Sequence, residues 1–228
     1  MTFVSKMRIT IRPRPRSTTP GPSTISVEPA RLVVRSRPMR VLDFDVEARP
    51  LHWISGDYVS KEITAIAWAW CDQPETVTCY LLGETDPIDM LRAFVDDFNM
   101  SDMVTGHYIR GYDLPMVNGA LTEYQLPSLP DKLSQDTKID LIRRQGLSGS
   151  QENIGTMLGL EHPKVKMDQR SWRDANRLTP EGREKTRARV VGDVRQHIEM
   201  RAKLLELRYL TAPSVWKGGS APVEAYTP

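Results

Sequence analysis

The sequence predicts an α/β or α+β fold in which a central sheet is layered by helices. Residues 62–70 (EITAIAWAW) are largely apolar on both alternating faces, which is typical of a central strand covered on both sides. Shorter strand patterns at 41–46, 76–82 and 103–107 are followed by helical patterns later in the chain. A chain of 228 residues is long enough for one such domain with a full core, or for two small domains.

The first half of the expected domain contains a hairpin followed by a helix. Segments 62–70 and 76–82 flank a turn that contains Pro74, and this arrangement predicts two antiparallel strands. Asp86 and Pro87 then supply an N-cap and a first helical residue. Apolar residues follow at helical spacing, at positions Ile88, Leu91, Phe94, Val95 and Phe98.

The second half is richer in helices. A helix is expected over residues 114–124, and an extended segment over 135–141. Ser150 can cap a short helix that Gly159 helps to end.

The longest predicted helix begins at Thr179-Pro180 and runs toward Tyr209. Its expected apolar stripe consists of Val191, Val194, Ile198, Ala202 and Leu205. Residues 211–228 contain several Pro and Gly residues and are expected to form a flexible C-terminal tail.

The N-terminal segment differs from the rest in charge. Residues 1–40 contain nine Lys or Arg residues and one Glu, so their net charge is +8 and the remainder carries −6. Residues 1–39 also hold six prolines, and such a segment buries too little apolar surface to fold, so a disordered basic arm is expected. It could bind nucleic acid, act as an organelle transit peptide, be inert, or precede a true start at Met39.

Several classes of protein are excluded. No stretch approaches the ~18 apolar residues of a membrane helix, and the arm lacks the apolar core of a secretory signal. Cys71 and Cys79 are too few for a disulfide framework or a zinc site on their own, which favours small buried residues in a reducing compartment. We expect a cytoplasmic protein of bacterial or viral origin, with organelle targeting by the arm as the alternative.

Acidic residues end the first predicted strand. Asp45 and Glu47 are two positions apart, so both side chains project from the same face of the strand. Two carboxylates held this close repel each other unless a cation joins them or one binds a proton. Oxygen ligands favour Mg²⁺ or Mn²⁺. Such a pair at the end of a strand is, however, more often simply exposed to solvent without a bound ion.

Two further acids stand in distinctive settings. Asp113 follows a strand and opens a helix, where it could simply be the helix cap. Tyr108 and Tyr112 precede it and could stack on bases. Asp193 lies within the long helix, off the apolar stripe, although Asp is a poor helix former.

In this order and spacing, the segments LDFDVEA, TGHYIRGYDLP and VVGDV resemble the DEDD superfamily of 3′–5′ exonucleases. The intervening segments DTKIDLIRRQG, SQENIGTMLGLEHPK and WRDA resemble the exonuclease region of family B DNA polymerases. The resemblance spans about residues 40–209. It implies a ribonuclease H-like mixed central sheet flanked by helices, with an exonuclease-like domain over residues 40–210.

The resemblance also implies a site. Asp45, Glu47, Asp113 and Asp193 would be the catalytic acids and would bind two divalent ions, Mg²⁺ or Mn²⁺. Asp45 would bridge both ions, and Asp113 would serve one of them through water. The expected function is 3′–5′ hydrolysis of phosphodiester bonds at single-stranded or frayed ends of nucleic acid, with DNA as the expected class. Tyr108, Tyr112 and Arg189 would contact the substrate.

The sequence departs from the family pattern at the general base. The family has a Tyr four residues, or a His five residues, before the last acid, and here these positions hold Arg189 and Ala188. Arginine keeps its proton and cannot act as a base. Metal activation could suffice, another residue such as His197 could serve, or catalysis could be lost.

These alternatives define the rival functions. Loss of catalysis would leave a nucleic-acid-binding module, whereas a third possibility is a protein-interaction domain on the same fold. A chain without a polymerase domain would either associate with a polymerase or another replication or repair protein, or act alone.

Overall fold

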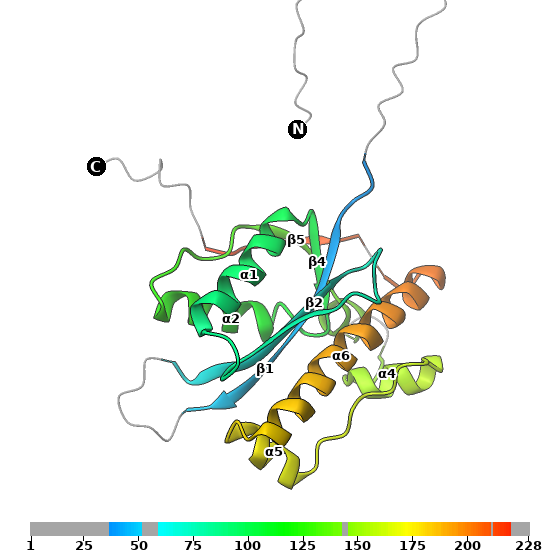
Figure 1. The fold of residues 1–228 in the computed structure, drawn as a ribbon. Helices are drawn as coiled ribbons and strands as arrows, with labels where there is room; N and C mark the ends of the chain where they lie inside the picture. The colour runs from blue at the N-terminus through cyan, green and yellow to red at the C-terminus, as the bar shows by residue number, and fades with distance from the viewer. Residues whose placement is uncertain (1–36, 52–58, 143–145, 211, 220–228) are drawn as a thin grey trace, which may run out of the picture. The chain divides into compact units, whose positions relative to one another are not determined.

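The computed structural model describes a domain built on a mixed sheet, and the described residues are 37–51, 59–142, 146–210 and 212–219. Nearly all of the arm expected over residues 1–39 lies outside these ranges, as do residues 220–228 of the expected tail. Within them, six strands form one sheet in the order β3-β2-β1-β4-β5-β6 (Figure 1).

The strands pair in both directions. Their bounds are β1 Val41–Pro50, β2 Lys61–Trp70, β3 Thr78–Leu81, β4 Met103–Gly106, β5 Lys132–Asp136 and β6 Ser214–Trp216. The pairs β1–β2, β2–β3 and β5–β6 are antiparallel, whereas β1–β4 and β4–β5 are parallel. This order confirms the predicted ribonuclease H-like sheet and the hairpin of β2 and β3.

Helices cover both faces of the sheet (Figure 1). Their bounds are α1 Pro87–Met100, α2 Asp113–Glu123, the π-helix η1 Thr137–Ile142, α4 Gln151–Leu158, α5 Gln169–Asn176 and α6 Pro180–Glu206. Three predicted caps are present: Asp86 accepts a hydrogen bond from the backbone of Ile88, Ser150 from Asn153 and Thr179 from Gly182. No helix within the described ranges is long and apolar enough to cross a membrane.

Strand β1 divides its side chains between two different environments. Leu42, Phe44 and Val46 are buried in the apolar core shared with α1 and α2. The alternate residues, which include Asp45 and Glu47, project from the opposite face, where α6 lies. One strand therefore supplies both core residues and carboxylates.

Small side chains let α6 lie close to the sheet. Ala65, Ala67 and Ala69 of β2 are buried against α6, where they contact residues that include Val190 and Val194. In the register of β1 and β2, these alanines lie opposite Glu47, Asp45 and Asp43, respectively. The acids of β1 are therefore beside alanines and within reach of side chains from α6.

Two expectations about local structure were wrong. The segment 135–141 is not extended throughout, because β5 ends at Asp136, whose carboxylate accepts hydrogen bonds from the backbones of Lys138 and Ile139 at the start of η1. In α6, Ala202 and Leu205 are exposed, so they do not continue the buried stripe.

Near its C-terminal end, helix α6 instead buries residues on a different side of the helix. Met200 and Leu204 are buried with Leu141 and Ile154, in a cluster separate from the one beneath β2. The expected tail is also ordered in part, since Ser214–Trp216 pairs with β5 as an edge strand. This pairing depends on distant backbone groups, which local turn residues do not reveal.

Candidate metal centre

Three of the four predicted acids converge at the boundary between β1 and α6. Asp45, Glu47 and Asp193 each offer a carboxylate oxygen, and these oxygens all lie within 4.8 Å of one another. The side chain of Asp193 is 3% exposed, whereas Asp45 and Glu47 are half-buried. The structure thus explains the acid within α6: it faces the acids of β1 and not solvent.

Asp113 lies next to this group but is held separately. It is the first residue of α2, it is buried, and its Oδ1 accepts a hydrogen bond of 3.0 Å from the backbone N–H of Val46. The interpretation of Asp113 as the helix cap was therefore wrong, because the cap position is Tyr112 and the Asp113 carboxylate binds β1. Its bond ties the second sequence motif to the first.

Burial and mutual repulsion oppose ionisation of these acids. Burial raises the pKa of Asp45 well above its ordinary value, and the charges of Asp113, Asp193 and Glu47 raise it further. Burial also raises the pKa of Glu47, although Arg189 opposes this effect. The pKa of Asp113 is raised to about 8, mainly by burial and despite its bond to Val46. A bound cation would relieve this repulsion.

Two basic side chains contact the acids. Arg189 of α6 donates a hydrogen bond from Nε to Oε1 of Glu47, and its Nη2 lies 3.8 Å from Oδ2 of Asp193. Lys164, from the segment between α4 and α5, places Nζ 2.9 Å from the same Oδ2. Sequence reasoning singled out Arg189 but missed Lys164, because no local pattern distinguishes this lysine from a solvated one.

Arg189 is held firmly in this position. Its Nη1 donates a hydrogen bond of 3.0 Å to the carbonyl of Val165, and its guanidinium lies 5.0 Å from the centre of the Trp172 ring. Burial lowers the pKa of Arg189, but Glu47 and Asp193 more than offset this effect and the net direction is upward. The group four residues before Asp193 is thus a fixed cation.

The remaining donor atoms fit a hard divalent ion. Oδ1 of Asp193 is buried and has no hydrogen-bond partner among the described residues. A buried carboxylate oxygen without a partner lowers the stability of the folded protein. Asp45 and Glu47 each offer an oxygen within 4.8 Å of a carboxylate oxygen of Asp193. Carboxylate oxygens are the ligands that Mg²⁺ and Mn²⁺ prefer, so Asp45, Glu47 and Asp193 could hold one such ion.

The loop before Asp113 is anchored by a buried acid. Asp136 accepts hydrogen bonds from the backbone N–H groups of Tyr108 (3.0 Å) and Arg110 (2.9 Å). Tyr108 has φ 77, an uncommon value for a bulky residue, and its side chain is among the exposed apolar ones. Lys138 lies 3.9 Å from its ring centre. This loop therefore presents an aromatic ring with a cation over it.

The second predicted stacking residue, Tyr112, also has a cationic neighbour. The ammonium group of Lys61 lies 4.3 Å from the ring centre of Tyr112 and 3.2 Å from its hydroxyl. Both tyrosines of the second motif thus combine an aromatic surface with a lysine, which suits contact with bases and phosphates.

His197 is not available as a general base. It is 2% exposed, its Nδ1 lies 2.5 Å from Oδ2 of Asp43, and its Nε2 lies 2.9 Å from the hydroxyl of Thr137. The same hydroxyl lies 2.9 Å from Nδ1 of His107, whose other nitrogen is near the carbonyl of Gly149. These polar contacts link α6, β1 and η1.

Three other acids, from η1 and α5, have structural partners. Asp168 caps α5 through the backbone of Ser171, and Asp174 lies 3.9 Å from Arg170. Asp140 pairs with Arg110. Neither Cys71 nor Cys79 forms a disulfide, and burial raises the pKa of Cys71 to about 12.

A hollow of about 430 Å³ adjoins the acids on the side of the two basic residues. It is lined by Glu152, Lys164, Val165, Lys166, Met167, Trp172 and Arg189. Its volume lies within the range of ligand-binding clefts.

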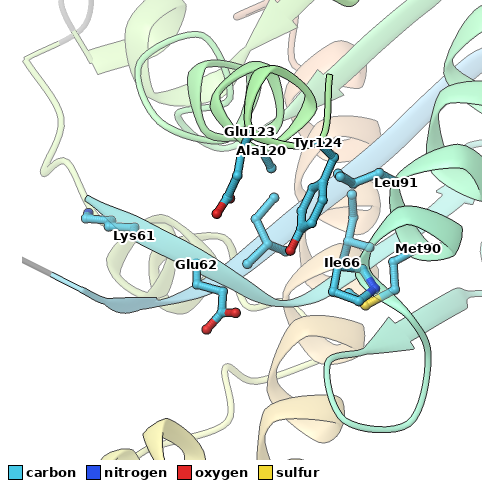
Figure 2. A pocket seen from close by; sticks show the side chains of 10 residues that line it. Lys61, Glu62, Ile66, Met90, Leu91, Ala120, Glu123 and Tyr124 are labelled. Carbon is cyan, nitrogen blue, oxygen red and sulfur yellow. The ribbon is translucent and has the colours of Figure 1, made fainter. Parts of the chain in front are cut away.

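A second pocket, shown in Figure 2, contains none of the predicted site residues. It lies between β2, α1 and α2, where Ile66, Leu91 and Tyr124 surround a space of about 20 Å³. That space is about the size of one water molecule, so this pocket is too small for a nucleotide.

Comparisons with known proteins agree with the fold. No protein-family model matches the chain, and no curated protein matches its sequence. Among solved structures, it is similar to the family B DNA polymerase from the hyperthermophilic archaeon Pyrobaculum calidifontis, with a TM-score of 0.61 and 18% sequence identity. The match covers 74% of this chain and 25% of the polymerase. At this identity the likeness establishes a shared fold: the chain has the architecture of part of a family B DNA polymerase.

Proposed function

We propose that this protein is a divalent-cation-dependent 3′–5′ exonuclease of the DEDD superfamily, acting on single-stranded or frayed ends of nucleic acid, with DNA as the expected class. One observation carries the proposal: carboxylates of Asp45, Glu47 and Asp193 meet within 4.8 Å, with Asp113 bonded to the strand between the first two. The fold and the order of the motifs support it.

The chain's residues divide the work of hydrolysis. A divalent ion bound by Asp45, Glu47 and Asp193 would lower the pKa of an attacking water and stabilise charge on the leaving oxygen. The guanidinium of Arg189 would bind a phosphate oxygen at the edge of the cluster. Tyr108 and Tyr112 would stack on bases near the 3′ end, and the hollow beside Trp172 would receive a nucleotide.

The expected partner is single-stranded nucleic acid. We further propose that the protein either works with a separate polymerase or another replication or repair protein, or acts alone. The chain spans about a quarter of the length of the polymerase that it resembles in fold.

A 5′-labelled single-stranded oligonucleotide incubated with Mn²⁺ tests the proposal. Wild type should give a descending ladder of labelled products, and Asp45→Asn should lower the rate at least about 100-fold, as expected for loss of a metal ligand. Asp174→Asn, which changes an acid of α5 outside the cluster, should cleave like wild type. Release of a labelled mononucleotide as the first product would contradict the polarity, and an uncut oligonucleotide would contradict the proposal.

A non-catalytic nucleic-acid-binding module is the second candidate. The contacts of Arg189 and Lys164 with the acids favour it, because they already neutralise part of the cluster and leave no base four residues before Asp193. Such a module would shift a labelled single strand in a gel without shortening it, and its affinity would fall steeply with salt.

A further inference from the structure

The acidic cluster already contains two positive charges from its own chain. Arg189 contacts Glu47 and lies near Asp193, and Lys164 contacts Asp193 from a different segment. Arg189 and Lys164 are only 16% and 21% exposed. They are therefore part of the site and not mobile surface side chains.

The charge balance distinguishes one ion from two. Ionised carboxylates of Asp45, Glu47, Asp113 and Asp193 carry −4, which two divalent ions would neutralise. With Arg189 and Lys164 in place, the net charge is −2, and one divalent ion suffices. A second ion would leave an excess of +2 in a half-buried site, where repulsion between cations a few ångströms apart is poorly screened.

The oxygens that are free to bind a metal also favour one ion over two. Oε1 of Glu47 and Oδ2 of Asp193 are engaged by the basic side chains, and Oδ1 of Asp113 by the backbone of Val46. The buried Oδ1 of Asp193 has no hydrogen-bond partner among the described residues. One carboxylate oxygen from each of Asp45, Glu47 and Asp193 lies within 4.8 Å of the other two. These oxygens form one compact donor set beside the basic pair.

We propose that this site binds a single Mg²⁺ or Mn²⁺ ion, and that Arg189 and Lys164 supply the positive charge that a second ion provides in a two-ion nuclease. The inference rests on the proposed function, but measurements of metal binding alone can test it. It replaces the expectation of two ions drawn from the resemblance.

Calorimetric titration of the full chain with Mn²⁺, at low salt and pH 7.5, tests the number of ions. Wild type should bind one ion per chain, and Asp45→Asn should abolish this binding. Arg189→Gln removes a positive charge beside the donor set, so it should tighten Mn²⁺ binding at least about tenfold. Two ions bound to wild type, or unchanged affinity in Arg189→Gln, would overturn the inference.

Arg187→Gln provides a matched control. It removes the same charge from the same helix, but Arg187 pairs with Glu84 and Glu184 and does not contact the cluster. Its Mn²⁺ affinity should stay within about threefold of wild type, whereas Lys164→Gln should tighten binding as Arg189→Gln does. Thermal unfolding of each variant in EDTA verifies that it is folded, and Lys164→Gln keeps the test decisive if Arg189→Gln fails to fold.

Binding and cleavage separate this inference from the proposed function. One bound Mn²⁺ with no cleavage of the labelled strand would overturn the nuclease proposal and leave the single-ion site standing. Cleavage of the labelled strand by a protein that binds two Mn²⁺ ions would overturn the single-ion inference and support the nuclease proposal. Absence of Mn²⁺ binding in wild type and in both charge-removing variants would overturn both.

Discussion

The candidate site depends on a few carboxylates held closer together than their charges favour. Spacing within a strand indicated that Asp45 and Glu47 share a face, and the rarity of a mid-helix acid singled out Asp193. Neither signal could reveal that Lys164 reaches Asp193, since that contact depends on how the segment between α4 and α5 folds back on α6. Local sequence patterns therefore singled out the individual acids, but not the lysine that pairs with Asp193.

Replacing one repelling acid should stabilise the metal-free protein. Burial and three neighbouring carboxylates raise the pKa of Asp45, so its ionised form destabilises the fold near neutral pH. Asp45→Asn in EDTA at pH 8 should raise the free energy of unfolding by about 1 kcal/mol or more. Thermal denaturation should show an increase of about 2–4 °C. Excess Mn²⁺ should stabilise wild type but not the variant, and a lower midpoint for Asp45→Asn in EDTA would refute the account of repulsion.

Stability of the metal-free protein should fall as pH rises. The pKa of Asp113 is about 8 in the folded protein and near 4 in an unfolded chain. The folded state therefore holds a proton that the unfolded state releases, and this stabilisation is lost as pH rises between these values. The raised pKa values of Asp45 and Glu47 act in the same direction.

Thermal midpoints in EDTA from pH 5 to pH 9 measure this effect. Asp113→Asn can still accept the hydrogen bond from Val46, but it cannot titrate, so its stability should decline less steeply than that of wild type. Parallel curves for the two proteins would show that Asp113 does not titrate as described.

At the scale of elements, local signals predicted helix starts better than strand ends. Asp86, Ser150 and Thr179 act within one turn of sequence, and all three caps are present. The end of β5 was predicted wrongly. The Asp136 carboxylate accepts hydrogen bonds from backbone N–H groups of the following turn and of the loop before Asp113, and these bonds accompany the end of the strand. The sequence around such an aspartate does not reveal this role, because some of its hydrogen-bond partners are distant in the chain and approach it only in the folded protein.

The contact between Asp43 and His197 should hold α6 on β1. Both side chains are almost fully buried, and Oδ1 of Asp43 has no hydrogen-bond partner among the described residues. His197→Ala would leave this carboxylate buried and unpaired, at a cost of about 3 kcal/mol. Denaturant unfolding of His197→Ala, Asp43→Asn and the double variant should reveal strong coupling, whereas additive losses would mean that the contact contributes little.

Close packing of α5 on α6 should depend on a glycine. A Cβ atom at Gly182 would lie 2.2 Å from the carbonyl oxygen of Asp174 and 2.6 Å from the nitrogen of Ala175, both of which are backbone atoms. Gly182→Ala should therefore destabilise the domain by about 1–3 kcal/mol.

Gly119→Ala is the matched control for this substitution. A Cβ at Gly119 in α2 would meet no atom within 4 Å, so this change should stabilise the domain by about 0.5–1 kcal/mol through helix propensity. The same sign of change for both variants in urea unfolding would contradict the packing argument.

At the scale of the whole molecule, topology converts three distant sequence motifs into one site. The parallel pairing of β1 and β4 brings the loop before Asp113 to the end of β1, and α6 crosses the alanine face of β2 to deliver Asp193. The order of the motifs was enough to predict the mixed sheet. The edge strand β6 was not predicted, because a strand of three residues is too short to show a recognisable sequence pattern.

The most direct test of the central claim is crystallography of the wild-type protein soaked in Mn²⁺, with anomalous scattering used to locate the metal. The account predicts one anomalous peak bonded to carboxylate oxygens of Asp45, Glu47 and Asp193, with Arg189 and Lys164 beside it. Saturating Mn²⁺ that leaves these carboxylates without a peak would contradict the account.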